Sequence, residues 1–221
     1  IAGQMGFAVG RINLLVKSAI LHDIGALKLQ QLPDAEDLDD GTKEVVKKNT
    51  QETLDRYGDL DEEVLRLITQ MQELYTRESD AEIPAGLKES VNANILYVAD
   101  AYDRMTAMKS FEEPTSEVKA VRELLADEER YNKKIVNALI HGISILYPGV
   151  CVELSNGEKG LVITENEDNI FEPTVLDFRN NNLYDLSDPS VKQTIEIADV
   201  MKTMDNRIKL DKSLLEEYQA N

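Results

Sequence analysis

The chain has 221 residues, of which 42% are hydrophobic and 30% charged, so it can bury a core and is not a disordered chain. Its formal net charge of −18 disfavours DNA, RNA and anionic membrane surfaces as partners, because like charges repel. The sequence contains neither a run of about 18 apolar residues nor a secretory signal. A single cysteine, Cys151, excludes an internal disulfide, so we expect a cytoplasmic protein with no membrane span in this chain. The first residue is Ile rather than Met, which leaves an upstream domain open.

Hydrophobic periodicity predicts helices over the first two thirds of the chain. Residues 1–10 are predicted to be the end of a helix closed by Gly10. Residues 11–23 are apolar on nearly all faces, so we expect this helix to be buried on most of them. Loops are expected at 32–43 and 78–88. The other predicted helices cover residues 42–57, 59–77, 90–109, 115–125 and 132–146.

The pattern changes after Pro148-Gly149. Two alternating runs on either side of Asn156-Gly157 predict a β-hairpin, because Asn-Gly suits a tight turn between strands. Two more strands are predicted over 174–178 and 182–186, then short helices over 188–204 and 211–219. The predicted fold is therefore mainly α: a helical domain over 1–147, then a small antiparallel β module with C-terminal helices over 148–221.

The dipeptide His22-Asp23 is the strongest candidate for a functional site. Histidine is a common ligand for transition metals, and a neighbouring carboxylate can share an ion with it. Asp100 and Asp103 are three residues apart and share one helix face. The chain has only two histidines, which limits the imidazoles that a metal site can recruit. The second, His141, is expected to be a packed or surface residue.

The stretch Leu21-His22-Asp23-Ile24-Gly25 resembles the signature of the HD superfamily of metal-dependent phosphohydrolases. It is most similar to the HD-GYP branch, whose members hydrolyse cyclic di-GMP. The segment 98–103 resembles a later family segment that supplies a ligand aspartate, here Asp100, and Tyr147-Pro148-Gly149 resembles the start of a β-rich extension. The resemblance covers roughly residues 1–125. It implies His22, Asp23 and Asp100 as metal ligands and Lys109 as a phosphate contact.

Other family positions are changed in this sequence. Ala26 stands where the family has a lysine, Asn49 and Gln72 fall near ligand histidines, and the Gly-Tyr-Pro signature is reduced to Glu82-Ile83-Pro84. Neutral amides are poor ligands for Fe, Mn or Zn, and a bridged pair of metals needs more donors than remain. Two alternatives stay open. Either one divalent ion (Fe, Mn or Mg) is held by His22, Asp23 and Asp100, or these residues are a structural relic without metal.

We therefore expect a degenerate HD-GYP-like signalling domain that is catalytically inactive. The resemblance implies a regulatory or binding module in bacterial cyclic di-GMP-type signal transduction, with a signalling protein or a cyclic dinucleotide as partner. The alternative is a metal-dependent phosphohydrolase with a reduced metal site. A pure scaffold and a homodimer are also left open.

Overall fold

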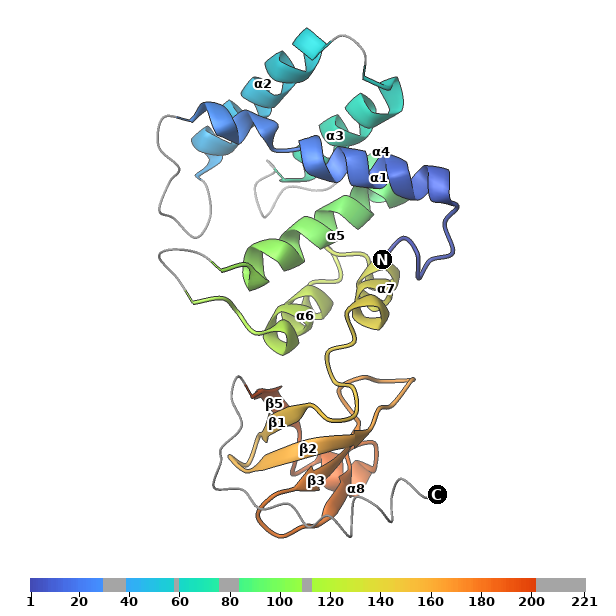
Figure 1. The fold of residues 1–221 in the computed structure, drawn as a ribbon, viewed down its shortest axis with the longest axis vertical. Coiled ribbons are helices and arrows are strands. Elements are labelled where there is room, and N and C mark those ends of the chain that lie inside the picture. The colour runs from blue at the N-terminus through green and yellow to red at the C-terminus, as the bar shows by residue number, and fades with distance from the viewer. Residues whose placement is uncertain (30–38, 58–59, 76–83, 109–112, 202–221) are drawn as a thin grey trace. The chain divides into compact units, whose positions relative to one another are not determined.

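The computed structural model describes residues 1–29, 39–57, 60–75, 84–108 and 113–201 (Figure 1). The chain divides into two compact units. The helical unit comprises Ile1–Thr115 and Ala120–Gly142, and the sheet unit joins Ser116–Lys119 to the chain from Ile143 onward. The mainly helical fold with a C-terminal antiparallel sheet is thus confirmed. The domain boundary predicted between residues 147 and 148 stays a prediction.

The helices follow the predicted order. They are α1 (Val9–Leu21), the 3-10 helix η1 (Ile24–Lys28), α2 (Asp40–Tyr57), α3 (Glu62–Tyr75), α4 (Ala85–Lys88), α5 (Val91–Thr106), α6 (Glu117–Ala126) and α7 (Lys133–Ile143). Helix α7 ends earlier than predicted because Ser144 adopts a positive φ of 48°, which no α-helix accommodates. Every helix among the described residues is too short or too polar to span a bilayer.

The start of the chain differs from the prediction. Residues before α1 form turns rather than a helix, and the chain changes direction at Gly6, whose φ is 72°. Gly10 does not close a helix, since α1 begins at Val9 and runs through it. The prediction was wrong because a glycine near an apolar run was interpreted as a stop signal, whereas Gly6 makes the turn.

Helix α1 is less buried than its composition predicted. Only Leu15 and Ser18 are buried, and Val16 is 50% exposed. The helix packs against α3 and α5 on one side. No second layer of described residues covers the opposite side, so the expectation of burial on most faces is wrong.

A small apolar core holds the end of α1 in place. Leu54, Val64 and Ile68 form its centre, with Leu21 and Ile24 among the residues packed against it. These two residues flank His22-Asp23, so burial of their side chains fixes the backbone of the candidate site.

Gly25 lets η1 approach α2 closely. A Cβ atom at Gly25 would lie 2.3 Å from both Thr50 N and Val46 O, which is closer than non-bonded atoms can come. The Gly25 N–H donates to the buried Thr50 hydroxyl over 3.0 Å. The Ile-Gly exit of the motif therefore has a packing role, because only glycine leaves room for this contact.

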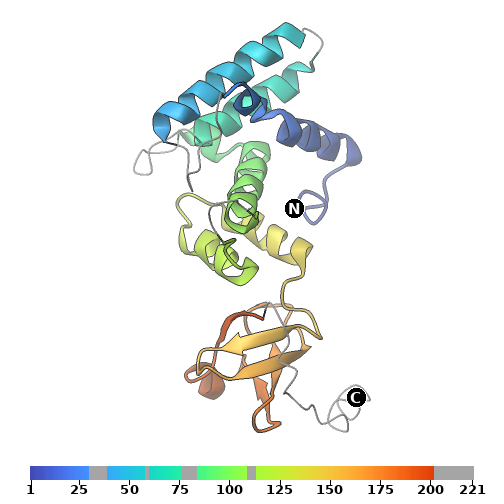
Figure 2. The same cartoon turned by 60° about the vertical axis from the view of Figure 1, so that its left-hand side comes forward.

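The sheet unit contains a five-stranded antiparallel sheet in the order β4-β3-β2-β1-β5. The strands are β1 (Cys151–Leu154), β2 (Lys159–Thr164), β3 (Thr174–Asp177), β4 (Leu183–Asp185) and β5 (Ile197–Val200). The predicted hairpin is confirmed, with Val152 opposite Gly160 and a positive φ at Gly157 in the turn. Figure 2 shows the same sheet from a second angle.

The predicted helix over 188–204 is wrong for most of its length. Helix α8 covers only Pro189–Lys192, with Asp188 as its N-cap. The chain then extends into β5, where Ile197 is fully buried and Val200 lies opposite Val152. Pairing with the free edge of β1 decided this segment, a long-range contact that local periodicity does not reveal. The predicted helix at 211–219 lies outside the described residues.

Candidate functional site at His22 and Asp100

The site is built where α1 meets η1, and α1 lies next to α5 there. His22 is the C-cap residue of α1, and Asp23 precedes η1. Asp100 lies in the third turn of α5. The backbone carbonyl of His22 accepts a hydrogen bond of 2.7 Å from the Gln72 side chain, which is buried in α3. Three helices therefore converge on His22: α1 contains it as C-cap, α3 binds its backbone carbonyl and α5 places Asp100 beside its ring.

Both ring nitrogens of His22 have partners. Nδ1 lies 2.7 Å from the Ala19 carbonyl oxygen, which can only accept, so Nδ1 carries a hydrogen. Nε2 lies 3.3 Å from Asp100 Oδ1. In a neutral ring with this tautomer, the Nε2 lone pair would face a carboxylate oxygen. The geometry therefore requires a cation between the two atoms or on the ring, which is either a proton or a metal ion.

The surroundings favour the protonated ring. Burial is the largest single influence and lowers the pKa of His22, but several groups together outweigh it. They are the hydrogen bond and charge of Asp100, the Ala19 carbonyl and the charge of Asp23, and the pKa is raised above the ordinary 6.5. The imidazolium is therefore stabilised in the folded chain.

Asp100 is held between two cationic side chains. Its Oδ2 atom accepts a bond of 2.9 Å from Arg104 Nε, one turn further along α5. The Arg104 guanidinium in turn lies 4.6 Å from the centre of the Tyr75 ring at the end of α3. Asp100 is only 16% exposed, so both pairs are partly shielded from water. The result is a connected chain of charges from His22 to Arg104.

Asp23 takes no part in the ion pairs that connect His22, Asp100 and Arg104. Its side chain is 63% exposed, and its Oδ1 lies 3.9 Å from His22 Nδ1, the nitrogen already bonded to Ala19. It also makes no capping hydrogen bond at the start of η1. The structure thus brings His22 and Asp100 together and leaves Asp23 on the other side of the ring.

Two amide side chains at the changed family positions support the backbone. Gln72 holds the His22 carbonyl, and Asn49 Nδ2 reaches the Gly25 carbonyl over 3.4 Å. Sequence reasoning treated them only as missing ligands and missed this positioning role. The available signal was a polar Gln72 on the apolar stripe of α3, since a buried amide needs a partner. Lys109 and the 82–83 part of the reduced Gly-Tyr-Pro signature lie outside the described residues.

The donor set does not suit a multi-metal centre. The described residues contain no cluster of three or more His, Cys, Asp or Glu side chains placed to hold an ion. His22 Nε2 and Asp100 Oδ1 are the right distance apart for two ligands of one ion, yet Arg104 binds the second Asp100 oxygen. Bridged metals need more anionic and imidazole donors than this site supplies.

A comparison with known protein families finds a match over the part of the chain that contains this site. Residues 1–105 match the family model described as HD domain. The match runs from before α1 almost to the end of α5, so it contains His22, Asp23 and Asp100. Residues 1–105 are therefore an HD domain, from a superfamily that generally comprises metal-dependent phosphohydrolases binding divalent metals. No curated protein and no solved structure matches the chain.

Proposed function

We propose that this chain is a degenerate HD-GYP-like signalling domain that is catalytically inactive and acts as a regulatory or binding module in bacterial cyclic di-GMP-type signal transduction. The proposal starts from the HD domain over 1–105 and the resemblance of Leu21–Gly25 to the HD-GYP branch. Its partner would be a signalling protein or the cyclic dinucleotide itself.

One observation carries the proposal. Asp100, the carboxylate that resembles a metal ligand, is bound on one oxygen by His22 and on the other by Arg104. Both oxygens of Asp100 are thus engaged by side chains of the protein. In a hydrolytic HD site, this carboxylate would be directed toward metal ions instead. A fixed guanidinium repels a divalent ion and cannot activate water as a metal does.

Calorimetry with cyclic di-GMP, with and without Mn²⁺, tests binding, and chromatography of the same mixtures tests hydrolysis. We expect no hydrolysis in either condition and substoichiometric metal in the purified protein. Binding in either condition would identify the dinucleotide as the ligand, and its absence would favour a protein partner. Metal-dependent cleavage of cyclic di-GMP would overturn the proposal.

A second function is supported by the His22 ring. In the neutral ring, with Nδ1–H given to Ala19, the Nε2 lone pair would point toward Asp100 Oδ1 at 3.3 Å, an arrangement typical of a metal-bound histidine. The alternative is a metal-dependent phosphohydrolase with one Fe, Mn or Mg ion. It predicts at least one bound metal per chain and turnover of bis(4-nitrophenyl) phosphate. That turnover should be lost in Asp100→Asn and kept in Asp103→Asn.

A further inference from the structure

The outer face of α1 exposes an apolar stripe. Val9 is 72% exposed, Val16 50% and Ile20 70%. In an ordinary amphipathic helix these positions would be polar, because the outward face meets water. Here the outer side of the helix carries three exposed apolar residues, and exposed apolar side chains gathered on one helix face mark a candidate interaction site.

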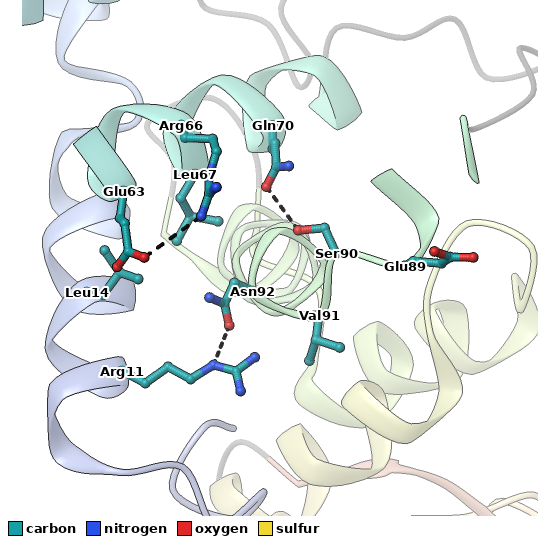
Figure 3. Close-up of a pocket in the computed structure, with 10 residues that line it drawn as sticks. All are labelled: Arg11, Leu14, Glu63, Arg66, Leu67, Gln70, Glu89, Ser90, Val91 and Asn92. Carbon is teal, nitrogen blue, oxygen red and sulfur yellow. Dashed lines mark hydrogen bonds and ion pairs between the residues drawn. The ribbon is translucent and has the colours of Figure 1, made fainter. Parts of the chain in front are cut away.

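The packed side of α1 is fixed and cannot turn to bury the stripe. Arg11 Nε donates to the Asn92 side chain over 2.8 Å at the start of α5, and the Arg11 guanidinium lies 3.7 Å from the centre of the Phe7 ring. Figure 3 shows Arg11 and Leu14 facing Glu63 and Arg66 of α3 across a groove lined largely by polar and charged side chains. An apolar partner gains nothing from that groove. Among the described residues of the helical unit, none buries the stripe, so it is open to a partner.

The spacing of the stripe suits another helix. Val9, Asn13, Val16 and Ile20 are separated by four, three and four residues, the spacing of the a and d positions of a heptad repeat. Asn13 is exposed and lies within this row. A single asparagine in an apolar seam favours a pairing in which it meets a polar equivalent, as in two-stranded coiled coils. Two copies of α1 satisfy this requirement for each other.

Charge restricts which surfaces of two copies can meet. Each chain carries a formal net charge of −18, so contacts through acidic surfaces are opposed. Helix α1 contains Arg11 and Lys17 and no acidic residue. Two copies that meet through the outer face of α1 bring no carboxylates of this helix together.

We propose that the outer face of α1, formed by Val9, Asn13, Val16 and Ile20, is the contact through which two copies of this chain form a homodimer. One 13-residue helix offers a contact smaller than a standard protein interface. The dimer is therefore weak and reversible, with a dissociation constant expected in the micromolar range.

Sedimentation velocity over about 1–300 µM tests this contact with the whole chain. The wild type should pass from monomer to dimer, and Ile20→Glu and Ile20→Lys should each weaken the dimer by about tenfold or more, because either charge would be buried. Val45→Glu in α2 is the matched control. Val45 is 48% exposed, close to Val16, but lies outside the stripe, so its dissociation constant should stay within about twofold of wild type.

Circular dichroism of both Ile20 variants should match the wild type, because Ile20 is an exposed position. A wild type that stays monomeric throughout this range would overturn the proposal, whether or not another protein binds α1. Dimers weakened by Val45→Glu as strongly as by Ile20→Glu would also overturn it. A dimer that only one of the two charges disrupts would show that charge, rather than burial of the stripe, controls association.

Discussion

The helical unit and the sheet unit use their polar side chains in different ways. In the helical unit, buried polar groups join segments far apart in the chain, as in the bonds from Gln72 to the His22 carbonyl and from Gly25 to Thr50. In the sheet unit, a recurring arrangement is an asparagine or aspartate side chain that accepts an N–H two residues ahead and so forms a tight turn. These acceptors are Asn156, Asn166, Asn169, Asp177, Asn180, Asp185 and Asp188.

This difference bears on where a candidate site can be held. Local turn bonds need no neighbouring element, so the sheet can be built without placing a reactive group inside it. The long-range bonds of the helical unit hold one imidazole and one carboxylate in a half-buried position, which is how a binding site is kept in shape. The comparison can be tested through residues with matching roles in the two units.

The largest effect is expected at the two closely packed glycines, Gly25 in the helical unit and Gly160 in the sheet. Gly25→Ala would place Cβ 2.3 Å from two backbone atoms of α2, and should lower the free energy of unfolding by about 3 kcal/mol. Gly160→Ala would meet a Val175 methyl at 2.4 Å and the Leu176 carbonyl oxygen at 2.9 Å. A methyl can move more easily than backbone, so we expect about 2 kcal/mol.

Urea unfolding followed by circular dichroism measures both variants. Gly10→Ala is the control, since nothing lies within 4 Å of a Cβ there and the position is helical. It should stabilise the protein by up to about 1 kcal/mol. If Gly25→Ala behaves like Gly10→Ala, the close contact between η1 and α2 is not as described.

Asp100→Asn should have the next largest effect. It removes the charge that pairs with both His22 and Arg104 in a partly buried position, so we expect a loss of about 1–3 kcal/mol in the free energy of unfolding. Asp103→Asn on the exposed side of α5 should change it by less than about 0.5 kcal/mol. Equal effects of the two substitutions would show that the His22–Asp100–Arg104 connection contributes nothing to stability.

An acid-sensitive contribution is expected from Asp199 in the sheet unit. Burial, the largest influence, raises its pKa, but hydrogen bonds from Ser116, Lys119 and the Val200 N–H outweigh this and lower the pKa below the ordinary 3.8. A lowered carboxyl pKa contributes stability that is present above 3.8 and lost as the pH falls through the folded-state value. The advantage of wild type over Asp199→Asn should therefore shrink below pH 3.8.

Urea unfolding between neutral and acid pH measures this difference, with the exposed Asp168→Asn as control. The control should show no comparable change with pH. A difference between wild type and Asp199→Asn that is constant across the range would contradict the prediction.

The smallest effect is expected for His22, and its dependence on pH runs in the opposite direction to that of Asp199. Its pKa is raised above 6.5, so it contributes stability that is complete below 6.5 and is lost as the pH rises through the folded-state value. In EDTA, wild type should exceed His22→Gln in stability by more on the acid side of 6.5 than in alkaline buffer. The exposed His141→Gln provides the control. A wild-type advantage that grows with rising pH would mean that the neutral ring is the favoured form.

Much of the fold was predictable from the sequence. The helices α2, α3, α5, α6 and α7 follow from apolar residues at helical spacing, and the β1–β2 hairpin follows from Asn156-Gly157. The His22-Asp23 motif likewise predicted the HD domain that the family comparison confirms. The ligand roles of His22, Asp23 and Asp100 stay predictions.

The sequence by itself determined the features that depend on a few neighbouring residues, such as helix periods, turns and the HD motif. The tertiary structure decided that Nε2 of His22 faces Asp100, that Arg104 binds the second Asp100 oxygen, and that residues 197–200 form a strand. It also left the outer face of the apolar α1 exposed. The physical reason is that these outcomes depend on which distant segments pack together, and local spacing contains no record of that choice.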